Sequence, residues 1–119
     1  MRALARASGL CFSVRLAYVE MRAALAAARR DRRLTPAALS RARRELESAW
    51  AATSPIEVDA DLVQVAGDLA DSERLRGYDA LHLAALVRLG PPDEVAHVAC
   101  WDFDLRRAAG SLGYTLFPS

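Results

Sequence analysis

Residues 77–85, which read Gly-Tyr-Asp-Ala-Leu-His-Leu-Ala-Ala, decide the fold. They place the carboxylate of Asp79 in the first turn of a helix predicted to run from about residue 78 to 89. Residues 100–105, Cys-Trp-Asp-Phe-Asp-Leu, follow an apolar run and place Asp102 where a strand ends and a helix begins. Hard cations such as Mg²⁺ take oxygen ligands and keep several waters, so carboxylates gathered at such positions suit a divalent-metal site.

Strand-like and helix-like segments alternate on either side of this region, and no repeat or linker divides the 119 residues. Apolar runs predict strands at residues 10–13, 56–58, 95–101 and 114–117. Periodic patterns predict helices at residues 14–30, 36–50, 61–75, 78–89 and 103–112, with residues 1–8 as the last turns of another helix. This alternation predicts one α/β domain with a small parallel sheet.

Capping and breaking residues mark where these helices begin and end. The predicted N-caps are Ser13, Thr35 before Pro36, and either Asp59 or Asp61. The predicted stops are Gly9, Gly77 and the run Gly90-Pro91-Pro92.

Composition narrows the function classes only modestly. The formal net charge is only +1, so the overall charge does not indicate a nucleic-acid-binding protein. Cys11 and Cys100 lack metal-ligand spacing and are interpreted as small buried hydrophobes in a reducing compartment. No apolar run has the length of a signal peptide or a membrane span, so a cytoplasmic protein is expected. No Gly-rich phosphate loop, Ser-His-Asp order or zinc pattern is present, which leaves nucleophilic catalysis by a side chain without support.

Glu20 is the carboxylate that is hardest to explain as ordinary surface. Steps of three and four residues from it meet an apolar stripe that includes Leu16, Ala17 and Ala24. An unpaired charge on a buried stripe is costly, so Glu20 is expected to neutralise, to pair with an arginine or to bind a cation. An exposed stripe is the remaining alternative.

The aspartates at helix starts have two readings. Helix capping and a favourable interaction with the helix dipole explain any isolated aspartate. However, Asp102 follows a predicted buried strand, and ligands bind at the carboxyl ends of strands in open α/β sheets. Asp104 is treated as a possible fourth ligand or as a first-turn dipole partner. His82, one turn after Asp79, is interpreted as a buried or half-buried histidine with a satisfied partner rather than as a ligand or base.

An arginine cluster lies where the first two long helices meet. It comprises Arg29, Arg30, Arg32, Arg33, Arg41, Arg43 and Arg44. Such a cluster can follow the phosphates of a nucleic acid. A solvated face whose arginines pair with Asp31, Glu45 and Glu47 is the alternative, and the sequence leaves both open.

Several segments in order resemble the PIN-domain ribonucleases, above all the VapC-like toxins of type II toxin–antitoxin systems. The similar segments are residues 13–20, 75–84, 101–109 and 113–118. The resemblance implies a PIN-like three-layer α/β/α fold over residues 1–119. It also implies that Glu20, Asp79 and Asp102 hold Mg²⁺ or Mn²⁺, with Asp104 as a less certain ligand.

The resemblance implies a metal-dependent endoribonuclease that hydrolyses RNA phosphodiesters. It also implies a cognate antitoxin protein and a homodimer as partners. Family members open with a strand carrying an aspartate in an L-D-T/S-S-A context, and this chain has no such segment. The chain is therefore expected to be N-terminally truncated relative to the family, with its activity impaired by the truncation. Its strand edges without partners are expected to require either rearrangement or a partner that supplies a strand.

Two further classes compete with the enzyme. A catalytically inactive PIN-like module that binds protein or RNA is favoured by the missing aspartate. A purely structural α/β domain whose acids are helix caps is the third reading.

Overall fold

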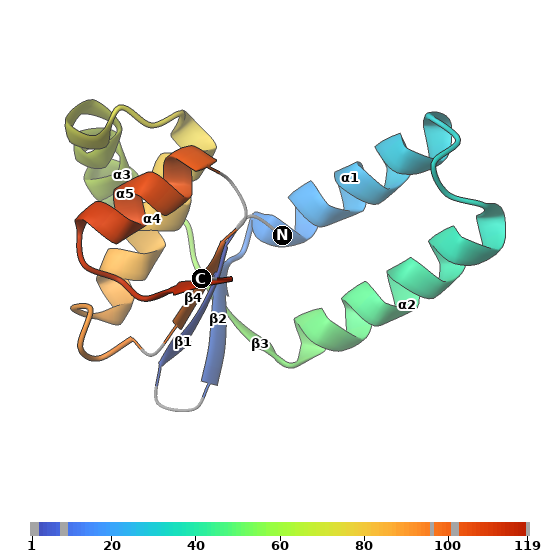
Figure 1. The fold of residues 1–119 in the computed structure, drawn as a ribbon, viewed down its shortest axis with the longest axis horizontal. Coiled ribbons are helices and arrows are strands. Elements are labelled where there is room, and N and C mark those ends of the chain that lie inside the picture. Colours follow the sequence, from blue (N-terminus) through green and yellow to red (C-terminus); the bar gives the residue numbers. More distant parts are fainter. Residues whose placement is uncertain (1–2, 8–9, 96, 101–102, 119) are drawn as a thin grey trace.

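The computed structural model describes residues 3–7, 10–95, 97–100 and 103–118, with the backbone alone at residues 3–7, 10 and 100. Helices and strands alternate after an initial pair of strands (Figure 1). The strands are β1 (Ala3–Ala7), β2 (Leu10–Val14), β3 (Thr53–Ile56), β4 (His97–Cys100) and β5 (Leu116–Phe117). The helices are α1 (Ala17–Arg30), α2 (Pro36–Ala51), α3 (Ala60–Glu73), α4 (Gly77–Leu89) and α5 (Phe103–Ser111).

Within the described residues, the strands form one sheet in the order β3-β2-β1-β4-β5. Strand β1 is antiparallel to both of its neighbours, whereas β2 is parallel to β3 and β4 is parallel to β5. Four of these five strands therefore share one direction, and only the central strand is reversed. The predicted α/β fold with a small, mainly parallel sheet is confirmed.

The predicted helix at residues 1–8 is wrong, because Ala3–Ala7 is the central strand β1. Its composition favours a helix, but its backbone pairs with β2 through Ala5 and Phe12 and with β4 through Ala3 and Cys100. Hydrogen bonding along both edges overrides the local preference. Strand β1 supplies a hydrogen-bonding partner for one edge of β2 and one edge of β4.

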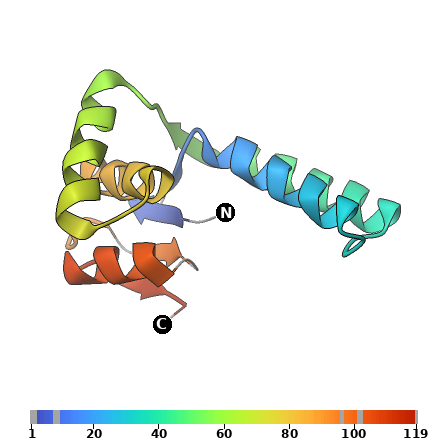
Figure 2. The ribbon, with the colours of Figure 1, turned by 90° about the horizontal axis from the view of Figure 1, so that it is seen from above.

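Helices α1 and α2 form an antiparallel pair, the helical hairpin, that projects away from the sheet (Figure 2). Thr35 begins α2 as predicted, since its side chain accepts a hydrogen bond from the backbone N–H of Ala38 at 3.1 Å. The predicted cap at Ser13 is wrong. Ser13 lies in β2, and α1 begins after Leu16, which makes no side-chain cap hydrogen bond.

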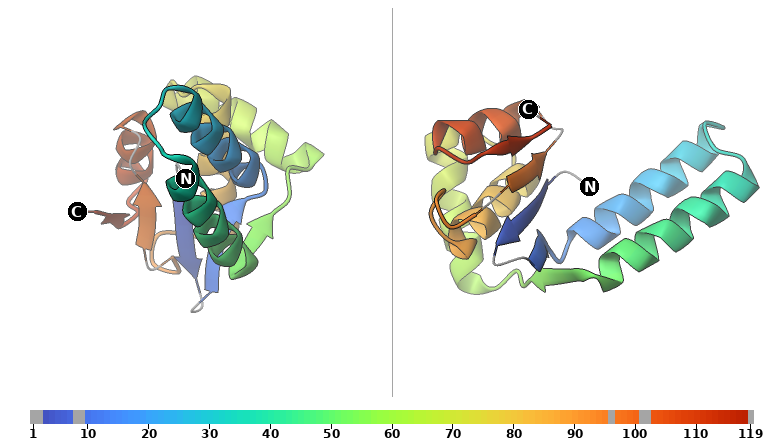
Figure 3. Two further views of the ribbon diagram at one scale, coloured as in Figure 1. Left: turned by 90° about the vertical axis from the view of Figure 1, so that its right-hand side faces the viewer. Right: turned by 60° about the horizontal axis from the view of Figure 1, so that its bottom comes forward.

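Helices α3, α4 and α5 lie on the side of the sheet opposite to the helical hairpin (Figure 3). Helix α4 is the most deeply buried of them, and its Leu83 is 0% exposed. The core between these helices and the sheet includes Leu62 from α3, Leu105 from α5 and Val98 from β4. Burial of α4 holds its first turn, which carries Asp79, firmly against the end of the sheet.

Several boundaries differ from the predicted ones by a few residues. Strand β3 ends at Ile56, where the predicted strand began, and β5 is limited to Leu116–Phe117. Helix α3 ends before Arg74, whose backbone is left-handed at φ 55°, and not at Gly77, which begins α4. Asp59 rather than Asp61 caps α3, accepting a hydrogen bond from the N–H of Leu62 at 2.8 Å. Gly90 ends α4 as predicted.

Of the helices in the described part of the chain, none combines the length and the apolar character that crossing a bilayer requires.

Candidate functional site

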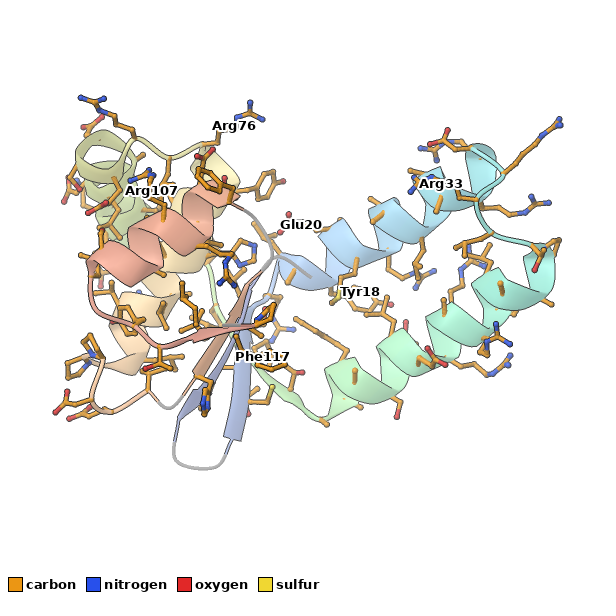
Figure 4. All side chains as sticks on the ribbon, viewed as in Figure 1. Tyr18, Glu20, Arg33, Arg76, Arg107 and Phe117 are labelled. Atoms are coloured by element: carbon orange, nitrogen blue, oxygen red, sulfur yellow. The ribbon has the colours of Figure 1, made fainter. Side chains whose placement is uncertain are left out.

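The candidate site lies at the edge of the sheet where β2 ends and α1 begins. Strands β2 and β4 share a direction, since both are antiparallel to β1, so their carboxyl ends lie at the same edge. The carboxyl ends of parallel strands are where α/β proteins bind ligands. Glu20 lies at this edge, in the first turn of α1, where the helical hairpin leaves the sheet (Figure 4).

Glu20 on α1 and His82 on α4 connect the two helices that carry the candidate site. The Nε2 atom of His82 lies 2.9 Å from the Oε1 atom of Glu20, and the two side chains are 2% and 21% exposed. An ionised carboxylate has no hydrogen to donate, so Nε2–H of the imidazole donates to it. A histidine is therefore one partner of Glu20, a pairing that the sequence did not lead us to expect. The interpretation of His82 as a buried histidine with a satisfied partner is confirmed.

Asp79 shares this part of the site with the His82–Glu20 pair. It is 2% exposed, in the first turn of α4, one helical turn before His82. Side chains three residues apart on a helix are neighbours, with their Cβ atoms about 5–6 Å apart. The hydrogen bond from His82 therefore places the Glu20 carboxylate beside the surface of α4 that carries Asp79. Glu20 and Asp79, from segments far apart in the sequence, are thus related through His82, which bonds the first and lies one helical turn after the second.

The other two predicted metal ligands are Asp104 and Asp102. Asp104 lies in the first turn of α5 and its side chain is exposed, as a first-turn dipole partner would be. Asp102 lies outside the described residues. Among the residues that are described, no three His, Cys, Asp or Glu side chains converge closely enough to hold a metal ion.

Two of the described side chains are of the type that a hard divalent cation takes as ligands. Mg²⁺ is commonly held by one or two carboxylates, with waters and substrate phosphates completing its shell. Glu20 and Asp79 supply two carboxylates, and the hydrogen bond from His82 to Glu20 is the kind of second contact that orients a metal ligand. The sequence signalled the orienting role of His82 only through its position one helical turn after Asp79.

A small cavity lies in the core beside His82. It has a volume of about 20 Å³, close to the space that one water needs. Ser13 and His82 are its polar wall residues, and the others include Val98 and Leu105. Ser13 is itself buried, at 4% exposed, which the sequence did not lead us to expect.

Ion pairs around the site fix the elements that carry it. The guanidinium of Arg88 donates to both oxygens of Asp59, at 2.7 and 2.9 Å, and thereby ties α4 to the start of α3. This pairing, with the hydrogen bond from the N–H of Leu62, lowers the pKa of Asp59 from 3.8 to about 2. Arg15 pairs with Glu57 next to the end of β3, through Nε at 2.8 Å.

Comparison with known proteins identifies the family. The chain is 48% identical over 107 residues to ribonuclease VapC45 of Mycobacterium tuberculosis (strain CDC 1551 / Oshkosh) and, to the same extent, to ribonuclease VapC49 of strain ATCC 25618 / H37Rv. Each alignment covers 90% of this chain and 73% of the relative. No protein-family model and no solved structure matches the chain. Its identity with these two relatives, over most of both sequences, shows that the chain belongs to the VapC ribonuclease family.

Proposed function

We propose that this chain is a metal-dependent endoribonuclease and the toxin of a toxin–antitoxin pair. The observation that supports the proposal is the hydrogen bond between Glu20 and the buried His82, one helical turn after the buried Asp79, in a chain 48% identical to two proteins named ribonucleases. The reaction is hydrolysis of an RNA phosphodiester, in which water attacks phosphorus and the bond to one ribose oxygen breaks.

The residues of this chain have distinct roles in that reaction. Glu20, Asp79 and Asp102 would hold Mg²⁺ or Mn²⁺, with Asp104 as a further candidate. When bound there, the metal supplies a water of lowered pKa and stabilises the charge that develops on the phosphate. His82 donates to Glu20 and keeps its carboxylate oriented, so it is a positioning residue. Burial of Asp79 limits its rotamers and reduces the entropy lost when it binds a cation.

The direct test is cleavage of a mixed RNA with Mn²⁺, comparing the wild-type chain with Asp79→Asn. Asparagine keeps the shape of the side chain but removes its charge, so we expect cleavage to fall by more than about 100-fold with little change in the fold. Glu20→Gln makes the same test on α1. The amide oxygen of the glutamine can still accept the hydrogen bond from His82. Asp102→Asn tests the residue that the family resemblance adds.

Asp71→Asn is the matched control, since Asp71 is an exposed aspartate on α3. EDTA is expected to abolish cleavage by the wild-type chain, and Mn²⁺ to restore it. If Asp79→Asn and Asp102→Asn both cut as well as Asp71→Asn, the assignment fails. If the folded wild-type chain does not cut at all, the inactive binding module becomes the better description.

The partners are part of the same proposal. A small antitoxin protein is proposed to bind and neutralise this chain, and a homodimer is proposed as its own assembly state. Co-expression with the product of the adjacent gene tests the first, because a cognate antitoxin co-purifies with the chain and inhibits its cleavage. Light scattering after size exclusion tests the second, since the dimer has twice the 12.9 kDa mass of the chain.

A further inference from the structure

The near-neutral charge of this chain conceals a strong separation of charge. Residues 29–44 contain seven arginines and one acid, Asp31, which gives this segment a net charge of +6. The other residues contain nine arginines and fourteen acids and carry a net charge of −5. Segregation of this kind creates a local positive potential that the total charge of +1 does not reveal.

These arginines occupy the outer half of the helical hairpin. In Figure 4, Arg33 lies at its far end, away from Glu20. Arg30 is ten residues beyond Glu20 along α1, which corresponds to about 15 Å of helix. Except for the half-buried Arg29, the seven side chains are exposed: Arg30, Arg32, Arg33, Arg41, Arg43 and Arg44.

Three acids, Asp31, Glu45 and Glu47, lie in or next to this segment, and among the described residues only Asp31 forms an ion pair with one of its arginines. Glu47 turns toward the base of the helical hairpin, where it bonds the hydroxyl of Tyr18 and lies 3.3 Å from Nη1 of Arg22. Asp31 reaches Arg33, at 3.4 Å. Among the described residues, no acid pairs with the remaining exposed arginines, namely Arg30, Arg32, Arg41, Arg43 and Arg44. The arginines are solvated, as one reading of the sequence held, but of the acids named in that reading only Asp31 pairs with one of them.

The surface also lacks the features of a protein-binding site. Every residue from 29 to 44 is described, and none of the large exposed hydrophobic side chains falls among them. Protein interfaces depend on buried aromatic or aliphatic anchors, whereas contacts to a nucleic-acid backbone depend on charge. Arginine in particular presents a planar set of donors that matches a phosphate group.

We infer that the outer half of the helical hairpin, residues 29–44, binds the sugar-phosphate backbone of the RNA that the site cleaves. This inference rests on the proposed function, which supplies RNA as the substrate. The hairpin captures the strand about 15 Å from Glu20, so its contribution is to affinity rather than to the chemical step.

The test measures binding without cleavage. A fluorescently labelled, unstructured RNA of about 20 nucleotides is titrated with the full chain in EDTA, at several NaCl concentrations between about 50 and 200 mM. Anisotropy gives the dissociation constant and its dependence on salt. The variant is Arg43→Gln with Arg44→Gln, since glutamine and arginine have similar helix propensities.

The control removes two positive charges from the other side of the molecule, with Arg74→Gln and Arg107→Gln. Figure 4 shows Arg107 on α5, far from the helical hairpin. Arg43→Lys with Arg44→Lys retains the charge and separates its effect from that of side-chain shape. Thermal unfolding followed by circular dichroism establishes that each variant is folded.

We expect the Arg43/Arg44 glutamine variant to bind roughly tenfold more weakly near 100 mM salt, and its salt slope to decrease by about 1.4. The lysine variant should retain most of the slope, and the control should bind like the wild-type chain. An unchanged slope in the glutamine variant overturns the inference, because residues 43 and 44 then make no contribution to RNA binding. An equal loss in the control also overturns it. Because no cleavage is measured, either result is independent of the Asp79→Asn test.

Discussion

The Nε2 atom of His82 on α4 lies 2.9 Å from the Oε1 atom of Glu20 on α1, across 62 positions of sequence. This contact holds a carboxylate of the helical hairpin against the most deeply buried helix. In His82→Phe a ring remains but the donor is lost, so the Glu20 carboxylate loses its orientation. We expect the dissociation constant for Mn²⁺, measured by calorimetry, to rise about 10- to 100-fold.

Tyr78→Phe is the control for this experiment, because Tyr78 lies on the same helix and is 52% exposed. It should leave Mn²⁺ affinity unchanged. If folded wild type and folded His82→Phe bind Mn²⁺ with equal affinity, His82 contributes to packing of the core and does not orient Glu20.

Leu83 follows His82 along α4 and is 0% exposed. Leu83→Ala leaves a cavity that the packed core fills only in part, so we expect the free energy of unfolding to fall by about 3 kcal/mol. Urea denaturation measures this loss. Val87→Ala, at a position of the same helix that is 39% exposed, should cost less than about 1 kcal/mol. Similar losses at the two positions would contradict the buried setting of α4.

Asp59 links stability to pH, because pairing with Arg88 lowers its pKa to about 2. A carboxylate whose pKa is lowered on folding stabilises the protein above its unfolded pKa, and the contribution disappears as pH falls toward the folded value. Asp59→Asn keeps a good N-cap but loses the charge. The melting temperature of wild type should therefore exceed that of Asp59→Asn at pH 5, with the difference shrinking toward zero near pH 2. A difference that stays constant over this range would contradict the ion pair.

Tyr18 connects the two helices of the helical hairpin at their base. Its hydroxyl bonds Glu47 of α2 and accepts from Nη1 of Arg22 at 2.7 Å, while its ring lies 5.6 Å from that of Trp50. Tyr18→Phe keeps the ring contact and loses both hydrogen bonds. We expect the free energy of unfolding to fall by about 1 kcal/mol. In Tyr78→Phe, where the hydroxyl has no partner among the described residues, the loss should be close to zero, and equal losses would contradict this account.

Local signals predicted the ends of several helices correctly. Thr35 and Pro36 predicted the start of α2, and Gly90 predicted the end of α4, because a cap or a chain break acts within a few residues. The strand β1 could not be predicted in this way. Residues 3–7 have a helix-favouring composition, and only pairing with β4, far along the chain, makes them a strand.

The site shows the same division between local and distant information. Asp79 was recognisable because it begins a helix, and Glu20 because it interrupts an apolar stripe. The contact between Glu20 and α4 was not recognisable, since it is made with His82, on a helix far along the chain. The stripe itself is buried at Ala17 but exposed at Ala24, where α1 has already left the sheet.

The reversed central strand has a consequence for how the chain is made. Strand β1 emerges about 90 residues ahead of β4, so at translation rates of about 5–20 residues per second it waits on the order of 5–20 s for its second neighbour. Throughout that interval the β1–β2 pair exposes a free hydrogen-bonding edge, the kind that recruits strands from other chains. The nascent protein is therefore most vulnerable to misassembly on the ribosome, before residues 97–100 arrive to close the sheet.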